Sequence, residues 1–275
     1  MWFSADNLTL TACQALCVAL PAAGLPRWGE RLRGGAWALI LPLSIAVVVG
    51  AIELAPGTAD ILTWVALILV PVGCALALGW AAHRAWWPAA LLAVPLLALA
   101  WALPDDRWGQ AGTTLLITGS AVTAGRLLAG AAPLTLLKAG IIAMAIIDAV
   151  LVFSNNLQPA NAVLVSASPG AGLPQLQSAS WGHSSLGYGD FFAAAVVGGI
   201  LAVEGRRQWV AAGAVLAVTY AWDQLFLIYD VLPATVPPAI VLAVFWVRRE
   251  PVGHGRPTAP VGTRVTPASR FFRAG

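Results

Sequence analysis

Long apolar runs alternate with short polar gaps along almost the whole chain. Each run is bounded by charged residues, Pro or Gly, and approaches the roughly 20 residues that an α-helix needs to cross a bilayer. The runs lie at residues 8–25, 36–55, 61–80, 86–103, 110–130, 134–153, 186–204, 208–229 and 232–247. This pattern predicts an all-α, polytopic membrane domain of nine transmembrane helices over residues 1–247. The Pro-, Gly- and Arg-rich residues 248–275 are predicted to form a basic, disordered cytoplasmic tail.

The composition also indicates a lipid environment. Of the 275 residues, 59% are hydrophobic and 10% are charged, whereas a soluble domain carries about 25% charged residues. The net charge of +3 does not indicate nucleic-acid binding, because the basic residues are dispersed in short gaps between apolar runs. Cys13, Cys17 and Cys74 lie within runs and lack the spacing of a zinc site or a disulfide framework. No metal or cofactor is therefore expected, and the lipid bilayer is the expected partner.

The distribution of basic residues predicts the orientation of the chain. If the N-terminus lies outside, all but one of the 15 basic residues fall in cytoplasmic gaps, near the cytoplasmic ends of runs, or in the tail. The exception, Arg107, follows Asp105 and Asp106. Cytoplasmic loops are enriched in Lys and Arg, so we expect a multi-pass protein of the cell membrane with a cytoplasmic C-terminus. Residues 1–6 contain no Lys or Arg, which favours a retained first helix over a signal peptide.

One gap between the runs is much longer than the others. Residues 154–185 contain no Asp, Glu, Lys or Arg, and loops of this length are often functional or disordered. The β-prone segment AVLVSA at residues 162–167 predicts a short strand within the gap. His183, near the end of the gap, is interpreted as a loop residue rather than a ligand.

Three acidic residues lie deep within the predicted spans: Asp148, Asp190 and Asp223. Ionisable groups at such positions are costly, and by default they indicate function. Asp148 lies five residues before Phe153, and Asp190 lies four residues after Leu186. These positions are about 7.5 and 6 Å below the outer ends of their spans. Because neighbouring spans run antiparallel, both carboxyl groups are expected at one level.

Two carboxyl groups in contact cannot both ionise cheaply, so they share a proton. One then acts as a base on a water molecule while the other, as an acid, protonates a substrate carbonyl. Asp190 stands in the segment Gly187-Tyr188-Gly189-Asp190, where both glycines are expected to let the helices approach closely. The pair therefore predicts an acid–base site within the membrane.

These residues resemble the motifs of the presenilin and signal peptide peptidase superfamily of GxGD intramembrane aspartyl proteases. That family carries an Asp on its sixth span, a GxGD motif on its seventh and a Pro-Ala-Leu motif on its ninth. At the corresponding places this chain has Ile147-Asp148, Gly187-Tyr188-Gly189-Asp190 and Pro238-Ala239-Ile240. Ile147 stands where the family often has Tyr, and Ile240 stands in place of Leu.

The resemblance implies a presenilin-like fold in which Asp148 and Asp190 are catalytic and Pro238, Ala239 and Ile240 line the substrate cleft. It implies transmembrane peptides or proteins as substrates. The outside N-terminus is similar to the signal-peptide-peptidase branch, whose substrates include signal-peptide remnants. The run that begins near Leu232 places Pro238 about 9 Å below the outer surface, near the level of the two acids. Two successive prolines are expected to interrupt helical hydrogen bonding there.

Other interpretations of the same residues stay open. Asp148 and Asp190 could form a buried structural pair, or they could act with Asp223 as the relay of a proton-coupled transporter or channel. Asp223 could instead make a structural contact through Tyr220 or Gln224. Prepilin peptidases share the GxGD element, but a Lys is expected soon after their Asp, whereas residues 191–192 here are both Phe.

Overall fold

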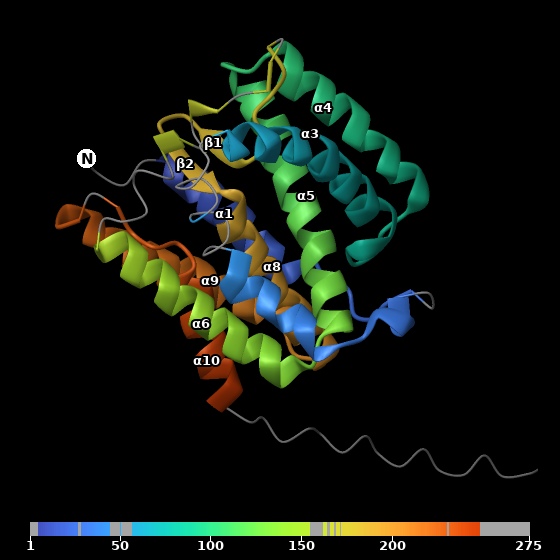
Figure 1. Cartoon of the computed structure of the whole chain (residues 1–275), viewed down its shortest axis with the longest axis vertical. Coiled ribbons are helices and arrows are strands. Elements are labelled where there is room, and N and C mark those ends of the chain that lie inside the picture. The colour runs from blue at the N-terminus through green and yellow to red at the C-terminus, as the bar shows by residue number, and fades with distance from the viewer. Residues whose placement is uncertain are drawn as a thin grey trace, which may run out of the picture.

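The computed structural model describes residues 5–26, 29–44, 50, 57–154, 162–163, 166–167, 169–170, 172–229 and 231–247. Most of these residues are helical, as predicted, and one small sheet accompanies them (Figure 1). The predicted tail at residues 248–275 lies outside the described residues. The helices are α1 (Ala5–Ala19), α3 (Thr58–Leu76), α4 (Ala93–Ala102), α5 (Arg107–Ala131), α6 (Leu134–Phe153), α8 (Tyr188–Val203), α9 (Gln208–Asp223) and α10 (Val236–Val247). Short helical turns are η1 (Gly29–Leu32), η2 (Gly35–Leu39), η3 (Ala77–Ala81), η4 (Trp87–Leu92) and η5 (Gln224–Leu227).

Among the described residues, four helical segments are long and apolar enough to cross a membrane: Thr58–Ala81, Arg107–Ala131, Leu134–Phe153 and Gln208–Leu227. Each of the other predicted runs also contains helix. The run at 36–55 lies partly outside the described residues, and in the runs at 8–25, 86–103, 186–204 and 232–247 the helix is shorter than the run. For example, α8 has 16 residues and is about 24 Å long at 1.5 Å per residue, against about 30 Å of hydrocarbon. Large apolar side chains on α3 are exposed, which suits contact with lipid: Ile61, Ile68, Leu69 and Val72.

Helix α8 lies at the centre of the fold and contacts α1, α5, α6, α9 and α10 (Figure 1). Its residues from Ala193 to Leu201 are buried. A Cβ atom at Gly198 would lie 2.4 Å from the carbonyl oxygen of Val18 in α1, and one at Gly199 would lie 2.5 Å from that of Gly125 in α5. Small residues therefore bring α8 into backbone contact with two neighbours, as is common between membrane helices.

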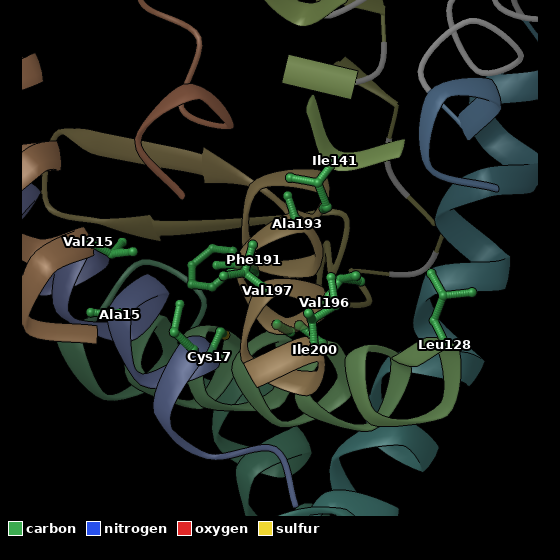
Figure 2. Packing of buried hydrophobic residues seen from close by; sticks show 14 of the residues in the cluster. Ala15, Cys17, Leu128, Ile141, Phe191, Ala193, Val196, Val197, Ile200 and Val215 are labelled. Carbon is green, nitrogen blue, oxygen red and sulfur yellow. The ribbon is translucent and has the colours of Figure 1, made fainter. Parts of the chain in front are cut away.

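Apolar side chains fill the space between these closely packed helices. Figure 2 shows Phe191 and Val197 of α8 near Cys17 of α1 and Val215 of α9. All three cysteines are free thiols; Cys17 and Cys74 are buried, and Cys13 is half-buried. The core therefore holds in place the helix that carries Asp190.

The short sheet occurs at a different place from the predicted strand. Strands β1 (Ser178–Trp181) and β2 (Ser184–Gly187) form an antiparallel hairpin that leads directly into α8. The strand prediction at 162–167 was wrong, because the described residues of that segment lie in no strand and Ala162 and Val163 are helical. A strand needs a paired neighbour as well as local propensity. Gly182 supplies the turn of this hairpin with a φ of +60°, a conformation that favours glycine.

One group of polar contacts joins the first turns of α1 and α5 to the hairpin. Arg107 donates to Asp6 at 2.9 Å, and its guanidinium lies 5.3 Å from the centre of the Trp181 ring. The His183 N–H donates to the second oxygen of Asp6 at 3.4 Å, and the Gly182 N–H donates to Gln110 at 2.9 Å. The Arg107 guanidinium holds the pKa of Asp6 below its usual range. His183 is thus a turn residue whose backbone makes this contact.

A second group of contacts joins the start of α6 to the ends of α8 and α10. Lys138 donates to Glu204 at 2.5 Å, and its ammonium lies 5.5 Å from the centre of the Trp246 ring. Arg206 also pairs with Glu204, at 3.3 Å. Arg126, which the predicted topology assigns to the cytoplasmic side, lies inside α5 and donates to the carbonyls of Gly24 and Trp80. Both groups connect helix ends that the predicted topology places on the same side.

Candidate active site

The structure brings Asp148 and Asp190 together from two helices in contact. Asp148 lies one and a half turns before the end of α6, and its residue is 7% exposed. Asp190 lies in the first turn of α8, and Asp148 is the charged group that acts on it electrostatically. Helices α6 and α8 contact each other, and α10 contacts both. The three helices that carry the three sequence motifs therefore form one cluster.

The first turn of α8 gives a physical account of the GxGD segment. Gly187 is the N-cap of α8, so Asp190 occupies the third helical position. The Asp190 carboxylate accepts a hydrogen bond from the Gly187 N–H, which is the reciprocal half of a capping box. The side chain that caps the first turn of α8 thus belongs to the acid on which Asp148 acts electrostatically.

The two glycines of this segment do not make the close helix contacts that the sequence predicted. A Cβ at Gly189 would meet no described atom within 4 Å, and a Cβ at Gly187 would meet only the Asp190 carboxylate, at 3.5 Å. The first turn of a helix faces its preceding loop more than its neighbours, and the close contacts occur lower down, at Gly198 and Gly199. Gly189, beside Asp190, is exposed, and no described atom lies near the position that its Cβ would occupy.

Tyr188, the variable residue of the segment, points to α5. Its hydroxyl lies 3.0 Å from the Ser120 hydroxyl, and its ring stacks on that of Phe192 with centroids 6.5 Å apart. A cavity of about 290 Å³ lies against Phe192, lined by apolar residues including Trp37 and Leu128. An apolar space therefore adjoins the helical turn that carries Asp190.

The first turns of helix α10 contain Pro238, Ala239 and Ile240. Helix α10 starts at Val236, four residues later than the predicted run, and Pro237, Pro238 and Ala239 are buried. The prolines thus occupy the first turn, where a missing N–H leaves no helical hydrogen bond unmade. The expected interruption of a helix was wrong for this reason. Ile240 is 40% exposed, unlike the two residues before it.

Two polar residues that the sequence analysis did not consider contact the acids. The Thr235 hydroxyl donates to Oδ2 of Asp148 at 2.5 Å. The Gln14 amide, from α1, donates to the backbone carbonyls of Asp190 at 3.4 Å and of Ala234 at 3.1 Å. The sequence signal for both residues was an uncharged polar side chain inside an apolar run.

Asp223, the third intramembrane acid, has a different partner. Its carboxylate accepts a hydrogen bond from Asn7 of α1 at 2.6 Å. Gln224, one of the expected partners, donates to the carbonyl of Tyr220. Ile147, next to Asp148, is half-buried. Within the described ranges, no three His, Cys, Asp or Glu residues lie close enough to hold a metal ion.

Comparison of the chain with protein-family models, with curated proteins and with solved structures finds no match.

Proposed function

We propose that this chain is an intramembrane aspartyl protease of the presenilin and signal-peptide-peptidase type. The observation that carries the proposal is the meeting of Asp148 and Asp190, from two apolar helices, with α10 packed against both. Asp148 is buried, and Asp190 is half-buried beside the exposed Gly189. Low exposure of both carboxyl groups suits a dyad that shares one proton.

The pair would hydrolyse a peptide bond by moving protons between two carboxyl groups that share one proton. The ionised carboxylate takes a proton from water as the water oxygen bonds to the carbonyl carbon, and the carboxylic acid protonates the carbonyl oxygen. The C–N bond of the resulting diol breaks when one carboxyl protonates the amide nitrogen and the other removes a hydroxyl proton. The dyad then again holds one proton, and no metal or cofactor takes part.

The proposed substrates are transmembrane peptides or proteins, including signal-peptide remnants. The apolar cavity against Phe192, two residues beyond Asp190, supports this substrate class, because a lipid-soluble segment can occupy an apolar space. A helical substrate must first unwind, since its amide groups are hydrogen-bonded within the helix. Helix-destabilising residues near the cleaved bond are therefore the expected determinant of cleavage.

The proposal includes nine membrane crossings with the N-terminus outside and the C-terminus in the cytoplasm. Two sets of contacts support it: the one around Asp6 and Arg107, and the one around Lys138 and Glu204. Each set connects only helix ends that this topology assigns to one side. The four helices of crossing length are α3 with η3, α5, α6, and α9 with η5.

The experiment that tests the function uses the purified full chain in liposomes of defined lipid. A synthetic transmembrane peptide with a central Gly-Pro or Gly-Gly pair is co-reconstituted, and the products are identified by mass spectrometry. We expect cleavage within the apolar segment by the wild-type chain and none by a variant with both Asp148→Asn and Asp190→Asn. Intact peptide with every sequence tested, or equal cleavage by both chains, would exclude the proposal.

A further inference from the structure

Thr235 lies in the turn before α10, where it is 3% exposed. Its hydroxyl donates to Oδ2 of Asp148 at 2.5 Å. The two residues are 87 positions apart in the chain. Hydrogen bonds to a carboxylate are short and strong. The Thr235 backbone N–H also donates to the Asp148 carboxyl group. Thr235 therefore holds the orientation of the Asp148 carboxyl group through both its hydroxyl and its backbone.

Gln14 lies in the middle of α1 and is 1% exposed. Its side-chain amide contacts two backbone carbonyls, that of Asp190 in α8 and that of Ala234 in the turn before α10. Ala234 directly precedes Thr235 in the chain. One buried amide thus connects the backbone of Asp190 with the backbone of Ala234, the residue just before the one that contacts Asp148.

We propose that Gln14 and Thr235 form a polar bridge that positions the two carboxyl groups for the reaction. The connection runs from the Asp190 carbonyl through the Gln14 amide to Ala234, and then through the Thr235 hydroxyl to Asp148. Both bridge residues act through the acids and need not touch the substrate. The inference rests on the proposed function, since it assigns roles in the same hydrolysis. A displacement of about 1 Å at a reacting group reduces rates by about 100-fold, so the loss of either bridge residue acts mainly on kcat.

The experiment compares single variants of the full chain in liposomes, with kcat, KM and the melting temperature measured for each. Thr235→Val removes the hydroxyl and keeps the shape, so we expect kcat to fall about 10- to 100-fold with KM unchanged. Thr235→Ser restores the hydroxyl, and most of kcat should return. The matched control is Thr219→Val, because Thr219 is 5% exposed and its hydroxyl has no hydrogen-bond partner among the described residues.

Gln14 has a matched control as well. Gln208 is another buried glutamine, whose amide contacts the carbonyls of Val18, Pro21 and Gly198. Gly198 lies eight residues beyond Asp190 in α8, or about 12 Å along the axis. We expect Gln14→Met to lower the kcat of the folded protein and Gln208→Met to lower only the melting temperature.

Three outcomes decide the matter. A fall in kcat for Thr235→Val and Gln14→Met, without the same fall in either control, supports the bridge. Wild-type kcat in both variants, while Asp148→Asn remains inactive, would overturn the bridge and leave the proposed protease standing. No peptide products from the wild-type chain would overturn the protease, and the bridge with it.

Discussion

The ammonium of Lys138 lies 2.5 Å from the carboxylate of Glu204, and so joins the start of α6 to the end of α8. Asp148 lies near the other end of α6, and Asp190 lies near the other end of α8. Lys138 is buried, and its ammonium also lies over the Trp246 ring of α10. The helices of the candidate site are therefore held together by ionic contacts at one end and by Thr235 and Gln14 at the other.

Removal of Glu204 should destabilise the protein more than removal of Lys138. Glu204→Gln leaves both Lys138 and Arg206 without their anion, whereas Lys138→Met leaves the pair of Glu204 with Arg206 intact. Breaking one side of a buried ion pair costs about 3 kcal/mol or more, because the remaining charge stays desolvated. We expect a lower melting temperature in detergent for Glu204→Gln than for Lys138→Met. The reverse order would show that the Arg206 contact contributes nothing.

The sequence was sufficient to predict the helical character of the chain and to place Asp148 and Asp190 on two helices in contact. Apolar runs report helices because the backbone must satisfy its own hydrogen bonds in lipid, and antiparallel neighbours bring residues of equal depth together. Helix ends were predicted less well. Leu186 and Gly187 belong to β2 rather than to α8, and α10 begins at Val236 rather than at Leu232, because hydrophobicity continues past a helix end.

Two features of the site were not predictable from single residues. Gln14 and Thr235 are uncharged, so their presence in an apolar run carries little cost, and only the tertiary arrangement shows which groups they contact. The close-packing glycines were expected at Gly187 and Gly189 but occur at Gly198, Gly199 and Gly125. A glycine serves equally well as a cap, a turn or a contact, and the choice depends on the neighbouring helix.

Both members of the acid pair should be required for cleavage. Asn keeps the volume of Asp148 or Asp190 but cannot exchange the proton, so either single Asp→Asn variant is expected to lose at least about 1000-fold in kcat/KM, or about 4 kcal/mol. Asp223→Asn is the matched control, because Asp223 is also intramembrane and bonds to Asn7 instead. It should retain most activity. The measurement is product formation from the reconstituted peptide at equal amounts of inserted protein. Full activity in either dyad variant would refute the pair, and loss in Asp223→Asn would add Asp223 to the site.

The proposed topology predicts where two reporters will be found. A reporter fused after Gly275 should be cytoplasmic, and one inserted near Gly170 should be external, because all but one of the 15 basic residues then face the cytoplasm. The check is accessibility to a membrane-impermeant label in intact cells and in permeabilised cells. Reversed labelling of both sites would exclude the outside N-terminus. Labelling of both sites on one side would exclude an odd number of crossings between residue 170 and the C-terminus.

The Asp6–Arg107 pair should stabilise the protein at neutral pH and lose this effect in acid. The pKa of Asp6 is lower in the folded protein than in the unfolded chain because Arg107 donates to its carboxylate. The stabilisation is therefore complete above the unfolded value of about 4, and is lost as the pH falls through the lower folded value. We expect Asp6→Asn to lower the melting temperature at pH 7, and the difference from wild type to shrink below about pH 4. Asp105→Asn, which removes an exposed acid two residues before Arg107, should give no such pH-dependent difference.

A proton-sharing dyad and a proton relay make opposite predictions for sealed vesicles. The dyad requires one neutral and one ionised carboxyl, so cleavage should follow a bell-shaped pH profile whose limbs belong to the pair. Hydroxyl-containing transition-state mimics of aspartyl proteases should compete for the site, since their hydroxyl replaces the water between the carboxyls. We expect peptide products that disappear with the inhibitor and proton flux no greater than that of empty liposomes. A relay would instead carry protons without a peptide present. Proton flux that depends on Asp148 or Asp190, with no products from helix-destabilised peptides, would replace the protease with a transporter.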